Sequence, residues 1–172
     1  NAGFDVVLAF DHDMESVQTY ERNLGQHVEQ LDIRNVDANY IKNKTGIVPG
    51  ELDLLAGGPP CQGFTKARRD GHLDDERRHL TLEYLRLVLE MKPRAFLMEN
   101  VPGILNIYQG KTKNQILSIF KSIGYDTKVK VLLAADYGVP QLRKRAFFIG
   151  NNLGIDPEFL FTLSPKALHS CK

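Results

Sequence analysis

The sequence contains no tryptophan and only two cysteines among its 172 residues. Cys61 and Cys171 lie far apart, so we expect no disulfide framework, and the scarcity of cysteine suits a reducing cell interior. No apolar run approaches the ~18 residues that a membrane span needs. These absences predict a soluble cytoplasmic protein, or a nuclear one in a eukaryotic cell, with no membrane contact.

An excess of either charge is also missing. The 22 basic and 21 acidic residues give a net charge of +1, which neither indicates nor excludes nucleic acid, because basic residues can gather on one face. The five histidines show no ligand spacing, so we expect no metal site. A chain of this length can bury roughly 70% of its unfolded surface in one core, which predicts a globular unit.

Short β-rich runs alternate along the chain with runs of helical period. Strands are expected at 5–10, 51–58 and 94–100, and helices at 13–25, 79–91 and 112–124. Asp13 is placed to cap the first helix, and Thr112 with Gln115 to form a capping box on the third. Two further strands, 127–135 and 145–151, are separated by a connection too short for a helical crossover, which predicts an antiparallel pair at the sheet edge.

The alternation predicts an α/β fold with a mostly parallel sheet, helices on both faces and an antiparallel strand at the edge. In such folds, ligands bind outside the carboxyl ends of the parallel strands. These ends carry Asp11, the Cys61 loop and Glu99, so we expect two acids and a thiol along one rim. The helix residues expected to face inward are Val17, Tyr20 and Leu24, then Leu80, Tyr84, Val88 and Met91, then Ile116, Phe120 and Ile123.

The clearest local signal is the stretch GGPPCQGFT, residues 57–65. Two prolines fix backbone angles directly before Cys61, and a helical turn after it would stabilise a thiolate through unpaired N–H groups. Two interpretations stay open on these residues alone. Cys61 is either a displayed nucleophile or a small apolar filler in a turn.

Other candidate positions carry two interpretations each. Glu99 follows four apolar residues and suits proton donation at the lip of the sheet, or it caps the next loop. Asp11 suits ribose hydroxyls, or it caps a helix, a role that fits Asp13 better. Arg143 and Arg145 alternate as a strand begins, so they face one side. They suit an anionic or carbonyl-bearing ligand, or a charged edge strand.

Taken in order, three motifs resemble the DNA (cytosine-5)-methyltransferase family: Pro59-Pro60-Cys61-Gln62, Glu99-Asn100-Val101 and Gln141-x-Arg143-x-Arg145. Each motif alone is modest, but three in order at compatible spacing are specific. The segments AFDHDMESVQTYERNLG and LDIRNV also resemble family segments, so the similarity extends from roughly Val7 to Gly150. The motif PPCQGF resembles the bacterial DNA enzymes, which serve in restriction–modification systems, more than it resembles the subfamily that acts on transfer RNA.

The resemblance implies an S-adenosylmethionine-dependent methyltransferase fold and methyl transfer to C5 of a cytosine flipped out of double-stranded DNA. It implies that Cys61 adds to C6 of the base and that Glu99 holds the N3 and N4 edge. It further implies that Arg145, supported by Arg143, holds the O2 side. These roles agree with the thiol, acid and cations that the residues themselves indicate.

The resemblance also implies contacts to cofactor and DNA. The expected cofactor residues are Asp11 at the ribose, His12 against the adenine, Asp32 and Ile33 at the adenine, and Pro59. The expected target-base or DNA contacts are Gln62, Gly63, Thr65, Arg78, Asn100, Val101 and Gln141. The segment from Thr65 to Arg78 resembles the mobile loop that closes over DNA, and on its residues alone it is typical of a solvated loop.

The family's first glycine-rich motif and its target-recognition region are not found in the sequence. We therefore expect residues 1–150 to be an incomplete methyltransferase catalytic domain and residues 151–172 to be a tail of unknown role. Cofactor binding by this chain alone should be weak or absent, and a second chain or segment would supply the missing motifs. Two alternatives stay open: the same reaction on a transfer RNA cytosine, and a catalytically silent nucleic-acid-binding homologue.

Overall fold

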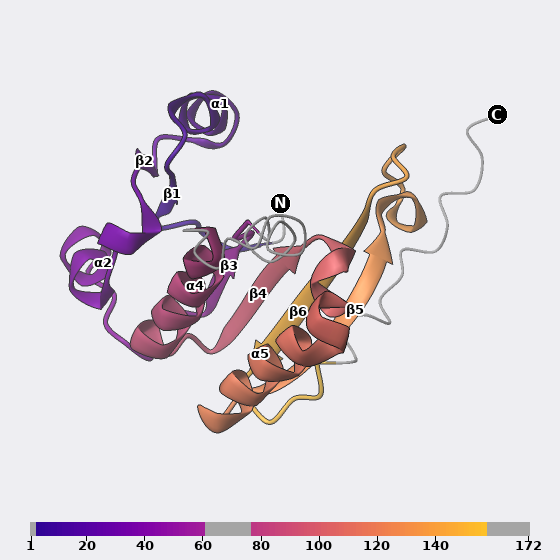
Figure 1. Ribbon diagram of the computed structural model, residues 1–172. Coiled ribbons are helices and arrows are strands. Elements are labelled where there is room, and N and C mark those ends of the chain that lie inside the picture. The colour runs from indigo at the N-terminus through magenta and orange to yellow at the C-terminus, as the bar shows by residue number, and fades with distance from the viewer. Residues whose placement is uncertain (1–2, 61–76, 158–172) are drawn as a thin grey trace.

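The computed structural model describes residues 3–60 and 77–157, without the side chains of 77–79 (Figure 1). The strands are β1 (Ala9–Asp11), β2 (Val28–Gln30), β3 (Leu54–Gly57), β4 (Ala95–Asn100), β5 (Asp126–Leu133) and β6 (Lys144–Asn151). The α-helices are α1 (Met14–Leu24), α2 (Ala38–Thr45), α4 (Arg77–Met91) and α5 (Lys111–Ser122). Short 3-10 helices are η1 (Ile33–Asn35), η2 (Pro102–Leu105), η3 (Ile107–Gly110) and η4 (Ala134–Tyr137). Within the described part, no helix has the length and apolar character to cross a membrane.

The strands form two sheets. β1 and β2 pair in parallel, and the larger sheet has the order β3-β4-β6-β5. In the larger sheet β3 and β4 run parallel, whereas β6 runs antiparallel to both of its neighbours. The predicted α/β fold and the predicted pairing of the last two strands are therefore confirmed. The reversed strand is β6, which lies inside the sheet, and β5 forms its edge.

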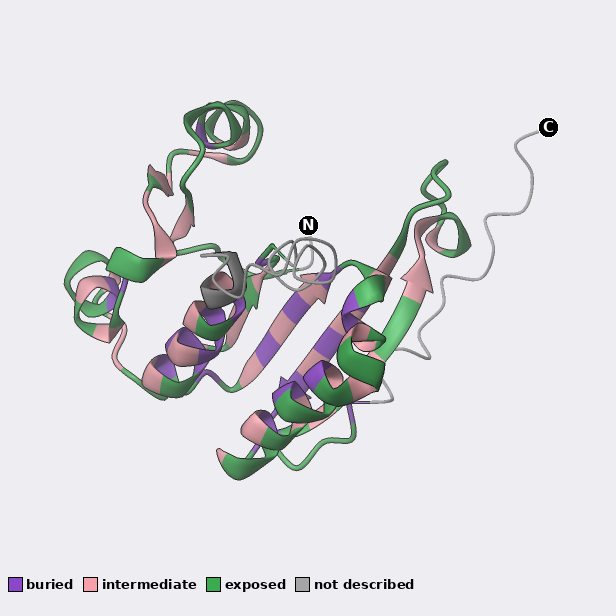
Figure 2. Ribbon diagram, viewed as in Figure 1, coloured by how far each residue is buried: buried purple, intermediate pink, exposed green. Residues whose placement is uncertain are grey.

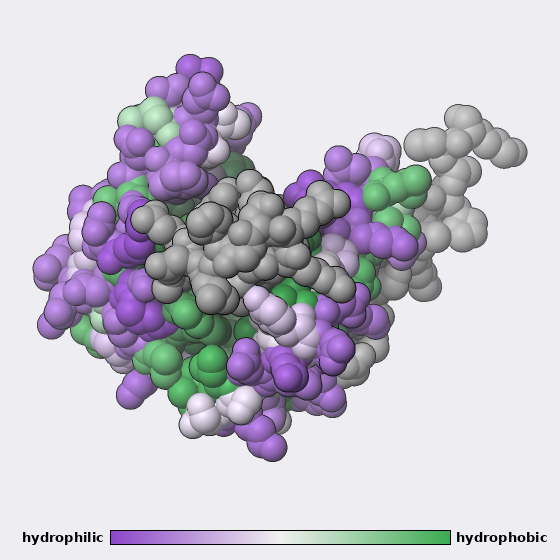
Figure 3. All heavy atoms as spheres, in the orientation of Figure 1, coloured by the Kyte–Doolittle hydropathy of each residue, from purple (hydrophilic) through white to green (hydrophobic). Residues whose placement is uncertain are grey.

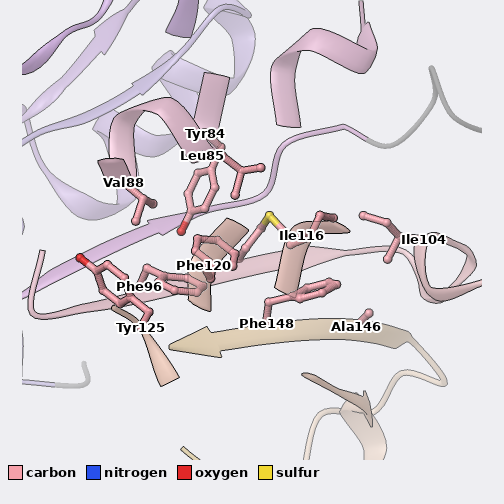
Figure 4. Packing of buried hydrophobic residues seen from close by; sticks show 11 residues of the cluster. Tyr84, Leu85, Val88, Phe96, Ile104, Ile116, Phe120, Tyr125, Ala146 and Phe148 are labelled. Atoms are coloured by element: carbon pink, nitrogen blue, oxygen red, sulfur yellow. The ribbon is translucent and has the colours of Figure 1, made fainter. Parts of the chain in front are cut away.

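Helices α4 and α5 pack against one face of the larger sheet (Figures 1 and 2). In this core Tyr84 and Val88 of α4 and Phe120 of α5 meet Phe96 of β4 and Phe148 of β6 (Figure 4). The rings of Phe96 and Phe120 stack with centroids 3.8 Å apart. The inward positions predicted for Tyr84, Val88 and Met91 of α4 and for Ile116, Phe120 and Ile123 of α5 are confirmed, whereas Leu80 is half-buried and belongs to neither apolar cluster.

Burial alternates along β4, and this alternation fixes which way its last residues point. Phe96, Met98 and Asn100 are buried toward the helices, while Leu97 and Glu99 are only partly buried on the other face. A shift of one residue in register would exchange the two sets. The packing of Phe96 and Met98 therefore holds Glu99 on the accessible face at the end of the strand.

A second apolar cluster lies on the side of α4 that faces α2. Leu87 and Met91 of α4 pack with Val36 and with Ile41 of α2. On the face viewed in Figure 3, the surface over α1 and α2 is mostly hydrophilic. Helix α4 thus joins the segment around η1 and α2 to the larger sheet through two different faces.

The helix ends follow the sequence signals in α1 but not in α5. Asp13 caps α1 by accepting a hydrogen bond from the Ser16 amide at 2.8 Å, and Gly25 ends the helix, as predicted. The prediction that Leu24 faces inward is wrong, since its side chain is 65% exposed.

The predicted capping box at Thr112 is also wrong. Helix α5 begins at Lys111 after Gly110, without a side-chain cap, and Thr112 is buried inside the helix. Tyr108, Gln109 and Gly110 all have positive φ angles, of 47°, 57° and 85°. This left-handed turn brings the chain into the helix before Thr112, so Thr112 has no capping role.

Among the described elements, helix α2, strand β2 and the four 3-10 helices were not predicted, and strands β1 and β3 are clearly shorter than predicted. Helix α2 carries ordinary signals, with Asp37 accepting from the Tyr40 amide and Gly46 in the left-handed region at its end. Strand β2 has three residues, too few for an alternating pattern. Within the expected strand 5–10 the ladder starts only at Ala9, because the residues before it have no partner strand in the described part of the chain.

The described part of the expected tail, residues 151–157, stays close to the sheet. Asn151 is the last residue of β6, is buried, and donates from Nδ2 to the Ile155 carbonyl at 2.8 Å. Its Oδ1 accepts from the Leu153 amide at 3.0 Å. Strand β6 therefore ends at Asn151, where the expected strand 145–151 also ends.

Gly150 tests how tightly the core is packed. A methyl group at this position would lie 2.6 Å from Phe96 Cζ and 2.7 Å from Thr127 Oγ1. We expect Gly150→Ala to lower the free energy of unfolding by roughly 1–3 kcal/mol through overpacking. Gly103→Ala is the control, because a methyl group there meets no atom within 4 Å. Urea denaturation of both variants measures the difference. Equal free energies of unfolding would show that the core makes room for the methyl group without losing stability.

Candidate catalytic and cofactor site

The reversed direction of β6 brings its first residues to the end of β4. In the ladder Asn100 lies opposite Ala146, and Glu99 lies opposite Phe147. The residues that precede Ala146 therefore lie beside the carboxyl end of β4, which is also the end where parallel β3 stops. This arrangement gathers residues from distant parts of the sequence at one rim.

Glu99 and two arginines form a charged cluster at this rim. Arg145 Nε donates to Glu99 Oε1 at 2.7 Å, and Arg143 Nη2 lies 3.9 Å from the same oxygen. The exposed fractions of the side chains are 24% for Arg145, 33% for Glu99 and 49% for Arg143. The structure thus brings three predicted site residues together, with the carboxylate between the sheet and solvent.

The loop that leads from β3 toward Cys61 passes directly over this cluster. A Cβ atom at Gly58 would lie 3.5 Å from Glu99 Oε2. Pro59 is buried, and its carbonyl accepts a hydrogen bond from Asn100 Nδ2 at 2.9 Å. Cys61, Gln62, Gly63 and Thr65, like the side chain of Arg78, lie outside the described residues.

Asn100 anchors the loop from below. Its side chain is 3% exposed, and its Oδ1 accepts from the Val101 amide at 2.9 Å. Both ends of the amide are therefore engaged with backbone groups. The DNA contact predicted for Asn100 would require the side chain to leave these bonds and its buried position, so the geometry favours a role in holding the loop.

Tyr84 supports the ends of β3 and β4 from the helix side. Its hydroxyl lies 3.0 Å from both the Leu55 carbonyl of β3 and the Leu97 carbonyl of β4. Burial raises the pKa of Tyr84, so the hydroxyl stays protonated and donates. A Cβ atom at Gly57 would lie 2.8 Å from the Tyr84 ring, and glycine is therefore the residue that lets the loop begin here.

The predicted ribose-binding acid lies at the end of β1. Asp11 Oδ1 accepts from the Asp13 amide at 2.9 Å and lies 3.1 Å from His12 Nδ1. The side chains of His12 and Asp11 are 81% and 50% exposed. Gln30 of β2 donates from Nε2 to the His12 carbonyl at 3.1 Å, so β2 fixes the backbone of the residue expected against the adenine.

Asp32 and Ile33 begin the next turn along the same edge. Asp32 caps η1 by accepting from the Arg34 amide at 2.9 Å, and the Arg34 guanidinium binds its carboxylate through Nε and Nη2. These hydrogen bonds from Arg34 lower the pKa of Asp32 to about 2, and the nearby His12 contributes in the same direction. Asp32 is thus a carboxylate at neutral pH, close to His12.

The remaining predicted contacts lie further out. Val101 is 39% exposed at the start of η2. Gln141 is exposed in the turn before β6. Neither has a described contact with Glu99. Among residues 3–60 and 77–157, no group of histidine, cysteine or acidic side chains could hold a metal ion.

Sequence reasoning did not assign roles to Gly58, Gln30, Tyr84 or the amide of Asn100. The signal for Gly58 was present in the repeated glycine before the prolines. Gln30, Tyr84 and Asn100 act through bonds to backbone carbonyls of other elements, for which a sequence carries no local pattern.

Comparison with known proteins agrees with this geometry. The family model for C-5 cytosine-specific DNA methylase matches residues 1–170. Type II methyltransferase M.AgeI of Thalassovita gelatinovora is 40% identical over 161 residues, which cover 91% of this chain and 37% of that protein. An E. coli prophage protein, solved as a candidate DNA modification methyltransferase, is 34% identical with a TM-score of 0.74 over 91% of this chain and 44% of its own.

A third protein shares the fold at lower identity. The Dnmt2 methyltransferase of S. pombe is 21% identical, with a TM-score of 0.75 over 98% of this chain and 51% of its own. This chain therefore spans about half of that protein and less than half of M.AgeI and the prophage protein. Because the family model covers nearly the whole sequence, the chain belongs to the C-5 cytosine-specific DNA methylase family.

Proposed function

We propose that this chain is the catalytic core of an enzyme that methylates C5 of cytosine in double-stranded DNA. The observation that carries the proposal is the ion-paired cluster of Glu99, Arg145 and Arg143 directly beside the loop that leads to Cys61. A flipped-out pyrimidine would fit between these groups, which are a carboxylate that can share its hydrogen bonds, two fixed cations and a thiol. The Type II methyltransferase names of the relatives favour DNA.

In this mechanism the Cys61 thiolate adds to C6 of the cytosine, and the electron pair of the C5–C6 double bond becomes available at C5. Glu99 accepts a hydrogen bond from the N4 amino group and, in its protonated form, donates one to N3, which offsets the negative charge that develops on the ring. Arg145, oriented by its bond to Glu99, holds the O2 side, and Arg143 adds a second positive charge. Once C5 carries the methyl group, a base removes the C5 proton, and the electron pair of that C–H bond re-forms the C5–C6 double bond and expels the Cys61 thiolate.

Two acids, the half-exposed Asp11 at the end of β1 and the partly buried Asp32 before η1, fit S-adenosylmethionine. When bound, this cofactor supplies an electrophilic methyl group to C5 of the base. The half-exposed Asp11 suits the ribose hydroxyls, and the exposed His12 ring suits one face of the adenine. Asp32, ionised beside Ile33, suits the adenine amino group, provided that it shares its bonds with Arg34. Pro59 would line the cofactor from the catalytic loop.

The proposed DNA contacts are Gln62, Gly63, Thr65, Arg78, Val101 and Gln141, and no longer include Asn100. The side chains of Val101 and Gln141 are exposed, which supports a role in contacting DNA. Methylation of a transfer RNA cytosine is the alternative, since it would use the same catalytic residues. A silent homologue would have no need for the Glu99–Arg145 pair beside the cysteine loop.

The open edges of β1 and β3 suggest where further chain belongs. β1 and β3 each end a sheet, and the side chains of Phe4, Val6 and Val7 before β1 are 53%, 49% and 46% exposed. Leu8, Phe10, Leu52 and Leu55 around the two strands pack against one apolar cluster. We infer that a segment or second chain carrying the glycine-rich motif adds a strand here and completes the cofactor site.

Covalent trapping tests the proposed reaction. The chain and its Cys61→Ala variant, each supplied with the glycine-rich segment, are incubated with S-adenosylmethionine and 5-fluorocytosine in duplex DNA or transfer RNA, because fluorine blocks the final proton loss. We expect a denaturation-resistant adduct on DNA only, absent from the variant, by mass spectrometry. The variant should keep the thermal stability of the parent, since a displayed thiol contributes little packing.

Each other outcome of trapping contradicts part of the proposal. An adduct on RNA alone would favour the alternative substrate. No adduct, from a folded chain supplied with the glycine-rich segment, would favour a silent homologue. A large loss of stability in Cys61→Ala would indicate that the thiol is a buried filler.

The completed sheet has its own test. Isothermal titration of the 172-residue chain with S-adenosylmethionine should show no binding in the micromolar range. Fusion of a family glycine-rich strand and loop before Asn1 should bring binding into that range, because the new strand would pair with the open edges. Clear micromolar binding by the chain alone would contradict the inferred segment.

Asn100→Ala tests the anchor of the cysteine loop. Removal of the amide leaves the buried Pro59 carbonyl without its donor, which should cost roughly 1–3 kcal/mol in urea denaturation. The rate of adduct formation should fall by about tenfold or more, because the thiol is no longer held in place. Asn152→Ala, at an exposed position after β6, is the matched control and should change neither quantity. An unchanged adduct rate in Asn100→Ala would remove the proposed role.

A further inference from the structure

A network of charged side chains on α4 reaches beyond its own helix. Arg86 Nε donates to Glu83 Oε2 at 2.6 Å, and Arg86 Nη1 donates to Glu90 Oε1 at 2.8 Å. The three side chains are between 25% and 32% exposed, so the network is partly shielded from water. Ion pairs at this spacing on a helix are common and add little stability when exposed.

The same guanidinium also binds the backbone of the η1 segment. Arg86 Nη2 donates to the Ile33 carbonyl at 3.0 Å and to the Val36 carbonyl at 2.8 Å. Glu90 Oε2 accepts from the Ala38 amide at 3.1 Å. Three backbone groups between residues 33 and 38 are therefore held by two side chains of α4.

Apolar packing and these bonds constrain the segment in different ways. Val36 is fully buried against Leu87 and Met91, which keeps the segment close to α4. Ile33 and Ala38 also pack against this cluster, but apolar contacts leave the backbone groups of the turn some freedom to rotate, because the hydrophobic effect is not directional. The bonds from Arg86 on both sides of Val36 remove that freedom.

We propose that Arg86 is a positioning residue for cofactor recognition, which acts by fixing the η1 turn so that Asp32 and Ile33 face the cofactor. The proposal rests on the proposed function, since it takes these two residues as cofactor contacts. Arg86 is not a catalytic residue, because it acts through the turn and touches no reacting atom. Glu83 and Glu90 orient its guanidinium.

The geometry requires arginine rather than any cation. A planar guanidinium offers five N–H donors in a fixed fork, and here Nε, Nη1 and both directions of Nη2 are in use. A lysine ammonium has one nitrogen and cannot reach two glutamates and two carbonyls at once. Arg86→Lys therefore keeps the positive charge on α4 but loses the hydrogen bonds that fix the η1 turn.

Amide hydrogen exchange on the 172-residue chain tests the hold directly and needs no cofactor. In the parent, the Val36 amide donates to the Ile33 carbonyl and the Asn35 amide to the Asp32 carbonyl. In Arg86→Lys these two amides should exchange about tenfold faster or more, because the turn opens locally, while amides within α4 keep their rates. Arg94→Lys is the control, since it makes the same replacement at a side chain that is 61% exposed and pairs with Asp53.

Two results of the exchange experiment would overturn the proposal. Unchanged rates for Asn35 and Val36 in Arg86→Lys would show that packing alone fixes the turn. Faster exchange throughout α4 in that variant would indicate a purely structural role for Arg86 in the helix.

Steady-state methylation tests the consequence for function. Arg86→Lys should raise KM for S-adenosylmethionine about tenfold, the effect of losing roughly one charged hydrogen bond, with kcat nearly unchanged. Arg94→Lys should change neither constant. An equal fall in kcat for both variants, or an unchanged KM in Arg86→Lys, would overturn the positioning role.

The two experiments also separate this inference from the proposed function. Failure of the parent to methylate any substrate, even with the glycine-rich segment supplied, contradicts the proposed function. The exchange rates then decide by themselves whether Arg86 holds the turn.

Discussion

The antiparallel pairing of β6 with β4 is the constraint on which the site depends. A parallel neighbour would carry its first residues at the opposite end of the sheet, about 20 Å away for six residues at roughly 3.3 Å each. Because β6 is reversed, Arg145 instead meets Glu99, and Arg143 lies near the same carboxylate. A short connection between β5 and β6 is enough to produce this reversal, so the cluster is a direct result of topology.

Helix α4 connects this part of the sheet to the η1 segment. One side presents Tyr84 to the ends of β3 and β4, and the other presents Arg86 to the η1 turn. The larger sheet and the η1 turn are therefore both bound by side chains of one helix. Displacement of α4 would therefore disturb both halves of the proposed site together.

Much of this could be predicted from the sequence, where local pattern and physics agree. The inward faces of α4, the cap at Asp13 and the paired last strands follow from periodicity and turn chemistry. The capping box at Thr112 failed because a left-handed turn before it, which only the folded chain reveals, starts the helix earlier. Asn100 was expected at the DNA, and its role in holding the loop, like the role of Arg86, could not be predicted, because their partners are carbonyls of distant segments that no sequence pattern marks.

The ion pair between Glu99 and Arg145 also bears on how the proposed pocket admits a base. Because the polar groups of the proposed pocket already bond one another, a base can enter only if it replaces the hydrogen bonds that it breaks. Cytosine offers the donor of its exocyclic amino group to the carboxylate in exchange for part of the bond to Arg145. Thymine and uracil present a carbonyl oxygen at that position, which would face a negative oxygen without a proton between them. Discrimination among pyrimidines would thus be built into the resting state of the protein.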